Sequence, residues 1–324
     1  MARCCAQPPL AFIVANSKNG NILFSHNCDE KTQPASLTKM MTLFITFRLL
    51  KKKVIGLDTR LKVSAVAAAQ SPCKLGVKVG DTISIRDAIL AIITKSANDV
   101  AVALAEYLAG GCMPRFVALM NLEAKRLKMT STVFKNPSGW KNPEQLTTAR
   151  DMAKLSRVLI TECSDYYKLF STKRFYFRKK WYRNHNKLLG VRNGMVIDGI
   201  KTGFVTASGY NIAVSASSGG NRLIVILLGE KDTRQRDLHV LGLLKNGFLK
   251  ISGAKKRPVT NILTVPKSKK IAPIRSSICD DLLEDALRAA NTKNLNGITK
   301  SRLFEHVTEL QQSQPNSKSG KELP

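Results

Sequence analysis

Strand-like segments stand at both ends of residues 10–251, and helical patterns fill the stretch between them. At the start, two apolar runs flank KNGN in LAFIVANSKNGNILFSHN, and Asn-Gly is a strong signal for a tight β-turn. At the end, VIDGIKTGFVTASGYNIAVSASSGGNRLIVILLGE has the pattern of three strands, the last two joined across SSGGN. This order predicts one antiparallel sheet that is built from both ends of the segment and covered by helices.

The stretch between the strands is expected to be mainly helical. The predicted helices are one from Ser36 to about Lys53, two in IRDAILAIITKSANDVAVALAEYLAGG with a break around KSAND, one in FVALMNLEAKRLKM and one in TTARDMAKLSRVLITE. DTRQRDLHVLGLLKNGFLKI is expected to be a closing helix, and AVAAAQSPCKLGVKVGDTISIRD to be rich in loops. The predicted fold class is therefore α+β, with an antiparallel sheet, flanking helices and an inserted helical lobe.

The composition changes near residue 253, which divides the chain into a predicted domain over 8–252 and a tail over 253–324. AKKRPVTNILTVPKSKKIAPIRSS is basic and contains three prolines, which is typical of a linker. CDDLLEDALRAAN and SRLFEHVTELQQ are predicted short helices, and SQPNSKSGKELP is polar enough to be expected to be disordered.

The charge of the chain indicates an anionic environment. With 52 Lys and Arg against 23 Asp and Glu, the formal net charge is +29. Such a protein attracts nucleic acid, anionic lipid head groups or acidic cell-wall polymer, and charge alone does not choose among them. Aromatic residues are few and no nucleic-acid-binding motif is present, so we expect no nucleic-acid partner.

Several other classes are not indicated by the sequence. It contains no run of about 20 apolar residues for a membrane span, and MARCCAQPPLAF lacks the apolar core of an intact signal peptide. No CxxC pair, histidine cluster or glycine-rich phosphate loop occurs. Buried free thiols are the expectation for the cysteines, which are Cys4, Cys5, Cys28, Cys73, Cys112, Cys163 and Cys279.

PASLTKMM, residues 34–41, contains a candidate nucleophile and base. Positions three apart share a helix face, so Ser36 at a helix start lies beside Lys39. A serine hydroxyl needs a base to become a nucleophile, and a lysine made neutral by desolvation and nearby positive charge can be that base. The same spacing occurs at 71/74, 138/141 and 252/255, where a capping serine and a solvated lysine are the simpler interpretation. Only Ser36 opens a long apolar helix.

Two further motifs follow in the chain. TKSANDV places Ser96 and Asn98 in a break between apolar helices, although the same spacing also occurs at 17/19 and 25/27, and a helix cap would explain it as well. Lys201-Thr202-Gly203 occurs once, on a late strand, where a lysine and a hydroxyl are suited to a substrate carboxylate. The simpler alternative is a solubilising lysine on an edge strand.

Taken in order, the three motifs resemble those of penicillin-recognising serine enzymes. AFIVANSKNGNILFSHNCDEKTQPASLTKMMT, SPCKLGVKVGDTISIRDAILAIITKSANDVAVALAE, FKNPSGW, NHNKLLG and DGIKTGFVTASGYNIAVSA more specifically resemble serine-type D-alanyl-D-alanine carboxypeptidases of the low-molecular-mass penicillin-binding protein class. The resemblance covers roughly residues 10–250. It implies a location outside the cytoplasm, in the periplasm or its equivalent.

The resemblance implies a role for each motif residue. Ser36 would attack the carbonyl between the two terminal D-alanines of a peptidoglycan stem peptide, with Lys39 as its base, and β-lactams would acylate the same serine. Ser96 would pass a proton to the leaving group, and Asn98 would bind the substrate backbone. Lys201, Thr202 and Gly203 would form the carboxylate site, and the N–H groups of Ser36 and Phe204 the oxyanion hole. No metal or other cofactor is implied.

The chain also departs from the family pattern. Phe204 follows the KTG motif where several relatives have histidine, and Cys73 stands where serine is frequent. The part after Ile251 resembles neither an all-β second domain nor an amphipathic membrane anchor, so peripheral contact of the basic surface with anionic membrane or wall is expected instead.

Two alternatives use the same motifs differently. A serine β-lactamase needs a carboxylate that activates the deacylating water, and no ExxxN-like loop lies between Asn98 and Lys201. A non-catalytic basic wall-binding protein would be expected to lose Ser36, Lys39 or Lys201, and the chain keeps all three.

Overall fold

The computed structural model describes residues 10–140, 142–190 and 194–253. The predicted tail, apart from Gly253, lies outside these residues. So do the two helices and the disordered end predicted within it.

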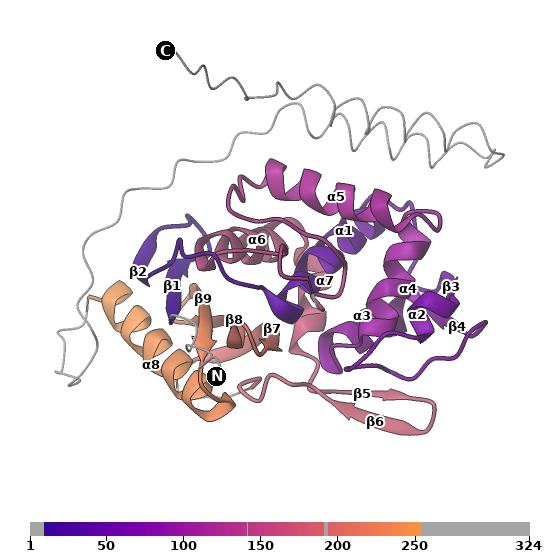
Figure 1. Cartoon of the computed structure of the whole chain (residues 1–324). Helices are drawn as coiled ribbons and strands as arrows, with labels where there is room; N and C mark the ends of the chain where they lie inside the picture. The colour runs from indigo at the N-terminus through magenta and orange to yellow at the C-terminus, as the bar shows by residue number, and fades with distance from the viewer. Residues whose placement is uncertain (1–9, 141, 191–193, 254–324) are drawn as a thin grey trace, which may run out of the picture. The chain divides into compact units, whose positions relative to one another are not determined.

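The strands from the two ends of the described chain form one antiparallel sheet (Figure 1). Its order is β2-β1-β9-β8-β7. The strands are β1 (Ala11–Asn16), β2 (Ile22–His26), β7 (Val196–Val205), β8 (Gly209–Ser218) and β9 (Asn221–Glu230). Because β1 pairs with β2 on one side and with β9 on the other, the first strand lies inside the sheet. The predicted topology is confirmed.

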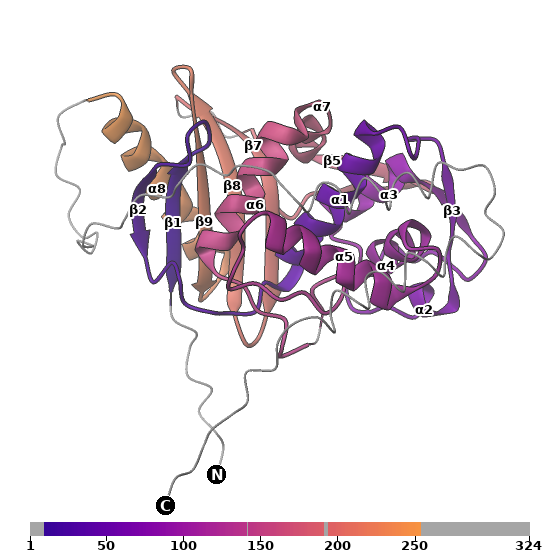
Figure 2. The same cartoon turned by 90° about the horizontal axis from the view of Figure 1, so that it is seen from above.

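Helices α6 (Ala149–Glu162) and α8 (Thr233–Ile251) flank the sheet from opposite sides (Figure 2). Val240 and Leu244 of α8 share an apolar cluster with Val14 and Val225 of the sheet. Both helices were predicted, and both begin where the sequence places a capping residue. Thr148 and Asp232 accept hydrogen bonds from backbone N–H groups in the first turns of α6 and α8.

The helical lobe lies beside the sheet and contains most of the remaining elements (Figure 1). They are α2 (Ala65–Ala68), α3 (Ile85–Thr94), α4 (Asn98–Leu108), α5 (Met113–Arg126), β3 (Arg60–Lys62) and β4 (Thr82–Ser84). Between the lobe and α6 runs α1 (Lys39–Lys51), which packs against α4, α5 and α6. This position buries α1 on nearly all sides and explains why its sequence is apolar throughout.

Three details differ from the predictions. The apolar helix begins at Lys39 instead of Ser36, because a short 3₁₀ segment, η1 (Ala35–Thr38), precedes it. The segment expected to be loop-rich contains α2 and β4. The sequence analysis also missed the hairpin of β5 (Arg174–Phe177) and β6 (Lys180–Arg183), which follows α7 (Ser164–Tyr167) and η2 (Lys168–Ser171).

The expectations about membrane spans and about cysteines can be compared with the described residues. No single described helix is long and apolar enough to cross a membrane, and α4 with α5 meets that test only as a pair bent by 91°. Cys28, Cys73, Cys112 and Cys163 are free, and Cys28 and Cys163 are buried.

Candidate active site

The hydroxyl of Ser36 and the amine of Lys39 lie side by side. Lys39 Nζ donates to Ser36 Oγ over 3.0 Å. Ser36 is half-buried in η1, while Lys39, the first residue of α1, has no exposed surface. In a 3₁₀ segment, side chains three residues apart lie directly above one another. The η1 segment, which ends at Thr38, therefore aligns Ser36 with Lys39 more closely than an α-helix would.

Two acceptors besides the serine hold the Lys39 amine. Asn98 Oδ1 accepts at 2.7 Å, and the carbonyl oxygen of Ser138 accepts at 2.6 Å. Three acceptors match the three donors of a protonated lysine, yet none of them carries a charge. The amine is therefore positioned for transfer of a proton without being locked in its charged form by a carboxylate.

The electrostatic surroundings of Lys39 favour the neutral amine. Burial lowers the pKa of Lys39 well below its usual value, and the charge of nearby Lys201 lowers it further, although Cys73 and Asp99 act in the opposite direction. A neutral lysine can accept a proton from the hydroxyl that it contacts. This is the condition that the sequence analysis set for Lys39 to be a base.

Ser96 lies in the predicted break between α3 and α4, whereas Asn98 is the first residue of α4 and reaches the site through its hydrogen bond with Lys39. Ser96 has a positive φ of 59°, which is rare for residues other than glycine and ends the run of helical geometry. Its side chain is buried, and its Oγ has no hydrogen-bond partner among the described residues. A buried hydroxyl without a partner is costly for stability, and in a site it is free to bind a ligand.

The KTG motif lies on β7, the edge strand of the sheet nearest to η1. Lys201 and Thr202 are buried, and Phe204 is 49 % exposed. Burial lowers the pKa of Lys201 to about 7, with a further lowering by Arg236 that Cys73 opposes. The solubilising-lysine interpretation is therefore wrong, because a buried amine does not increase the solubility of an edge strand.

Gly203 allows β7 to approach the serine. A Cβ at this position would lie 3.1 Å from both the Ser36 nitrogen and the Pro34 oxygen. A larger residue would push the strand away from η1, and with it Lys201 and Thr202, which directly precede Gly203. Gly203 is thus placed for a structural role at the site.

Gly139 supports the same serine from the other direction. Its φ is +84°, and a Cβ would lie 1.8 Å from the Ala35 oxygen, which is a direct overlap. The two residues before Gly139 hold α1, because the Ser138 carbonyl accepts from Lys39 and the Pro137 carbonyl accepts from Thr42. The loop that carries Gly139 is thus pressed against η1 and helps to fix the positions of Ser36 and Lys39.

Gly139→Ala is expected to destabilise the fold by about 3 kcal/mol, from left-handed backbone strain and overpacking together. Gly80→Ala is the matched control, because Gly80 has the same φ of +84° but open space where its Cβ would lie. The strain alone is expected to cost about 1–2 kcal/mol there. Chemical denaturation measures both values. Equal losses would mean that the contact with Ala35 carries no energy.

Several residues near the site were missed by the sequence analysis. His185 keeps part of its surface in solvent, but the protein atoms and the charges of Lys201 and Lys95 around it lower its pKa to about 4. Arg236 of α8 is 3 % exposed, and its charge acts on Lys201. His185 lies in NHNKLLG, a segment that carried the resemblance, whereas no sequence pattern marked Arg236.

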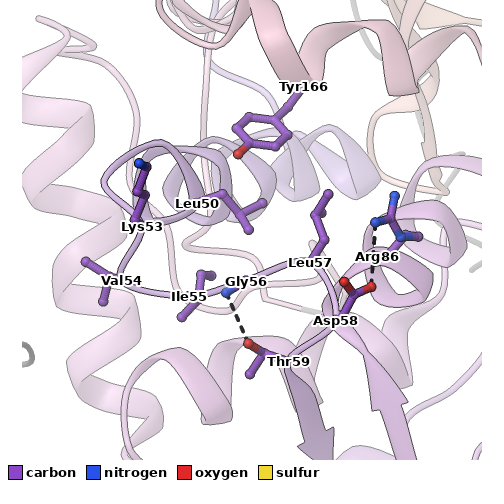
Figure 3. Close-up of a pocket in the computed structure, with 10 residues that line it drawn as sticks. All are labelled: Leu50, Lys53, Val54, Ile55, Gly56, Leu57, Asp58, Thr59, Arg86 and Tyr166. Carbon is purple, nitrogen blue, oxygen red and sulfur yellow. Dashed lines mark hydrogen bonds and ion pairs between the residues drawn. The ribbon is translucent and has the colours of Figure 1, made fainter.

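A separate concavity at the far end of α1 contains none of the predicted site residues (Figure 3). Leu50, Lys53 and Tyr166 line it, together with an exposed Asp58–Arg86 ion pair. It offers no buried nucleophile or base. Within the described ranges, no group of three or more His, Cys, Asp or Glu side chains is placed to hold a metal ion.

The arrangement is suited to acyl transfer. A hydroxyl contacts a buried amine whose pKa is lowered well below its usual value. A second hydroxyl, two residues before Asn98, has no partner among the described residues, and a second lysine, with a pKa of about 7, supplies positive charge for an anionic substrate group when it is protonated. These are the parts needed to attack a carbonyl carbon and to hold a carboxylate beside it.

Comparison with known proteins gives one consistent family. Residues 8–232 match the family model described as D-alanyl-D-alanine carboxypeptidase. Among curated proteins, the D-alanyl-D-alanine carboxypeptidase DacC of Escherichia coli is 39% identical over 244 residues, which cover 74% of this chain and 60% of that protein. The chain thus spans about three-fifths of the length of the curated relatives that it matches.

Solved structures agree with the sequence comparison. Penicillin binding protein 5 from Haemophilus influenzae has 33% sequence identity and a TM-score of 0.71, with 74% of this chain and 70% of that one covered. Penicillin-Binding Protein D2 from Listeria monocytogenes, in its ampicillin-bound form, has 31% identity and a TM-score of 0.66, with 74% and 96% covered.

Proposed function

Because the chain belongs to the D-alanyl-D-alanine carboxypeptidase family, we propose that it is a serine peptidase that removes the terminal D-alanine from peptidoglycan stem pentapeptides. The reaction passes through an acyl-enzyme on Ser36. The observation that carries this proposal is the 3.0 Å contact between Ser36 Oγ and the buried, pKa-lowered amine of Lys39.

The proposed acylation step gives one role to each of three side chains. Lys39 takes the proton of Ser36 Oγ as this oxygen attacks the carbonyl carbon between the two D-alanines. Ser96, whose Oγ has no partner among the described residues, passes a proton to the nitrogen of the leaving D-alanine. Asn98 binds the peptide backbone of the substrate and at the same time holds Lys39.

The substrate carboxylate and the oxyanion bind at β7. Lys201 and Thr202 bind the terminal carboxylate, and Gly203 keeps this strand close to the serine. The backbone N–H groups of Ser36 and Phe204 donate to the oxyanion of the tetrahedral intermediate, where each such donor is worth about 3–4 kcal/mol. Water then hydrolyses the ester and releases the shortened peptide.

β-Lactams are proposed to acylate Ser36 in the same way, because they present a strained amide beside a carboxylate. The Listeria monocytogenes relative, solved in an ampicillin-bound form, supports this. Peptidoglycan lies outside the cytoplasmic membrane, so the proposed substrate implies an extracytoplasmic location.

Fluorescent penicillin tests the proposed function. The purified chain should form a lasting covalent adduct that unlabelled ampicillin blocks, and it should release D-alanine from a peptide ending in D-Ala-D-Ala. Rapid release of the label without a lasting adduct would instead indicate a β-lactamase. A folded chain that takes no label would leave the non-catalytic wall-binding alternative.

The pH dependence of kcat/KM should be bell-shaped. As pH falls through the lowered pKa of Lys39, the base becomes protonated and the rate is lost. As pH rises above about 7, free Lys201 loses its charge and the carboxylate binds less well. The profile of kcat/KM reports the free enzyme, so both limbs should be visible there.

Lys201→Gln provides the control for the alkaline limb. This variant should have a raised KM at every pH and no alkaline limb, because it has no charge left to lose. An alkaline limb that persists in Lys201→Gln would assign that titration to another group.

A further inference from the structure

The hairpin of β5 and β6 carries two different faces. Its register pairs Arg174 with Arg183 and Tyr176 with Trp181, so these four side chains share one face, here called the outer face. Phe175, Phe177, Lys180 and Tyr182 make up the other face. Figure 1 shows the hairpin extending past α3 at the edge of the described fold.

Packing against the rest of the fold explains the residues of this second face, here called the inner face. Phe175 is 5 % exposed, and β5 and β6 both contact α3. Tyr182 donates its hydroxyl to the Leu75 carbonyl over 3.3 Å, which attaches the hairpin to the loop after α2. These contacts make the hairpin a supported element of the fold and give it a fixed orientation.

Packing does not explain the outer face. Tyr176 is 54 % exposed and Trp181 is 59 % exposed, and their ring centres are 5.0 Å apart. The guanidinium of Arg174 lies over the Trp181 ring at 5.3 Å from its centre. Two large aromatic rings thus form a solvent-facing apolar surface beside a cross-strand pair of arginines, Arg174 and Arg183.

The turn of the hairpin adds to its positive charge despite backbone strain. Arg178 and Lys179 have positive φ angles of 46° and 62°, at positions where Asn-Gly would be relaxed. Arg178 is held by an ion pair with Asp81 at 2.7 Å. Lys179 is exposed at the tip. The turn conformation alone would favour Asn and Gly at these two positions over arginine and lysine.

The surrounding sequence lacks compensating acids. Between Asp165 and Asp198 the chain has nine lysines and arginines and no Asp or Glu. The ion pair of Arg178 with Asp81 neutralises one of these charges. The hairpin therefore presents a field that attracts an anionic surface.

We propose that the outer face, together with Lys179 at the tip, docks on a bilayer that contains anionic phospholipids. Tyrosine and tryptophan favour the boundary between lipid head groups and acyl chains, because one part of each ring system is apolar and another is polar. Arginine and lysine beside them bind the anionic head groups. The outer face offers both kinds of contact in one rigid, exposed element.

The aromatic pair favours a bilayer over a soluble polyanion. A flexible acidic polymer would neutralise the arginines but would provide no apolar layer for Tyr176 and Trp181. An uncharged glycan could stack on the rings but would leave the charges without counterparts. Of these three surfaces, the anionic bilayer is the one that uses both features.

Vesicle binding of the full chain tests the proposal. The chain should sediment with vesicles of phosphatidylglycerol and phosphatidylcholine, and much less with phosphatidylcholine alone. Lys179→Gln with Arg183→Gln should weaken binding about 30-fold, at about fivefold for each cation near the surface. Tyr176→Ala with Trp181→Ala should weaken it about tenfold or more, because two interfacial rings are lost. Trp181→Phe should retain most of the binding.

Matched controls distinguish the effect of the hairpin cations on vesicle binding from the effect of the net charge of the protein. Lys18→Gln with Lys125→Gln removes two exposed lysines from the β1–β2 turn and α5, and should change binding much less than the hairpin pair. D-alanine release from a soluble peptide should be the same in all of these variants, so loss of docking is distinguishable from failure of the catalytic proposal.

Three results would overturn the proposal. The first is equal weakening by the control pair, which would make docking a matter of net charge. The second is equal binding to neutral vesicles. The third is hairpin-dependent binding to soluble polyphosphate or single-stranded DNA that matches binding to anionic vesicles, which would assign the surface to a polyanion.

Discussion

Ser36→Ala is expected to abolish labelling by penicillin and to lower kcat/KM for D-alanine release by roughly 10⁴-fold or more. This loss corresponds to about 5.5 kcal/mol of transition-state stabilisation. The variant removes the only atom proposed to bond covalently to the substrate. Lys39 keeps its contacts with Asn98 and the Ser138 carbonyl, so the fold should not change.

Ser252→Ala is the matched control for this substitution. Ser252 has the same spacing to a following lysine, but it lies just after α8, where its hydroxyl donates to the Leu249 carbonyl. Its labelling should equal that of the unchanged chain. Stoichiometric labelling of folded Ser36→Ala would contradict the proposed nucleophile, and mass spectrometry of the adduct would locate the true one.

Lys39→Met is expected to lower the acylation rate by roughly 10³-fold, within the range that general bases contribute. Methionine fills similar space and removes the amine, leaving Asn98 Oδ1 and the Ser138 oxygen without this donor. Lys39→Arg should be equally inactive, because a guanidinium stays protonated and cannot accept the serine proton. Stopped-flow measurement of penicillin acylation gives the rate.

Lys51→Met controls for the loss of a lysine from the same helix. Lys51 is the last residue of α1, so it lies at the end of the helix far from Ser36. It is exposed and donates to the Glu162 carbonyl. Its acylation rate should not change. Substantial activity in Lys39→Arg would mean that Lys39 acts through its charge, and another group would then have to be the base.

The sheet could be predicted from sequence because its signals are local. Asn-Gly and Gly-Gly turns and the short apolar runs beside them each depend on a few neighbouring residues, as does Thr148, which caps α6. The β5–β6 hairpin was missed because its turn is Arg178-Lys179, which lacks the Gly or Asn that usually indicates such a turn. The start of α1 was misplaced because η1 continues into α1 with right-handed backbone angles at Thr38 and Lys39, so no residue of the sequence marks the change from 3₁₀ to α-helix.

The site was predictable only where motif residues form it. Ser36, Lys39 and Asn98 meet through hydrogen bonds, and Gly203 packs against the serine, as the order of the motifs suggested. The Ser138 carbonyl could not be foreseen, because it contributes a backbone atom whose position depends on tertiary packing. Arg236 acts on Lys201 through space from another element, which no spacing within the sequence encodes.

The interior position of β1 in the sheet determines when the sheet can finish folding. β1 comes first in the described chain but pairs with β9, whose residues are made some 210 positions later. Until β9 emerges, one edge of β1 has no partner and can pair with another chain. Contacts of such long sequence separation form slowly. A truncated or partly synthesised chain should therefore be prone to aggregate, and a chaperone that covers its first strands should raise the yield of folded protein.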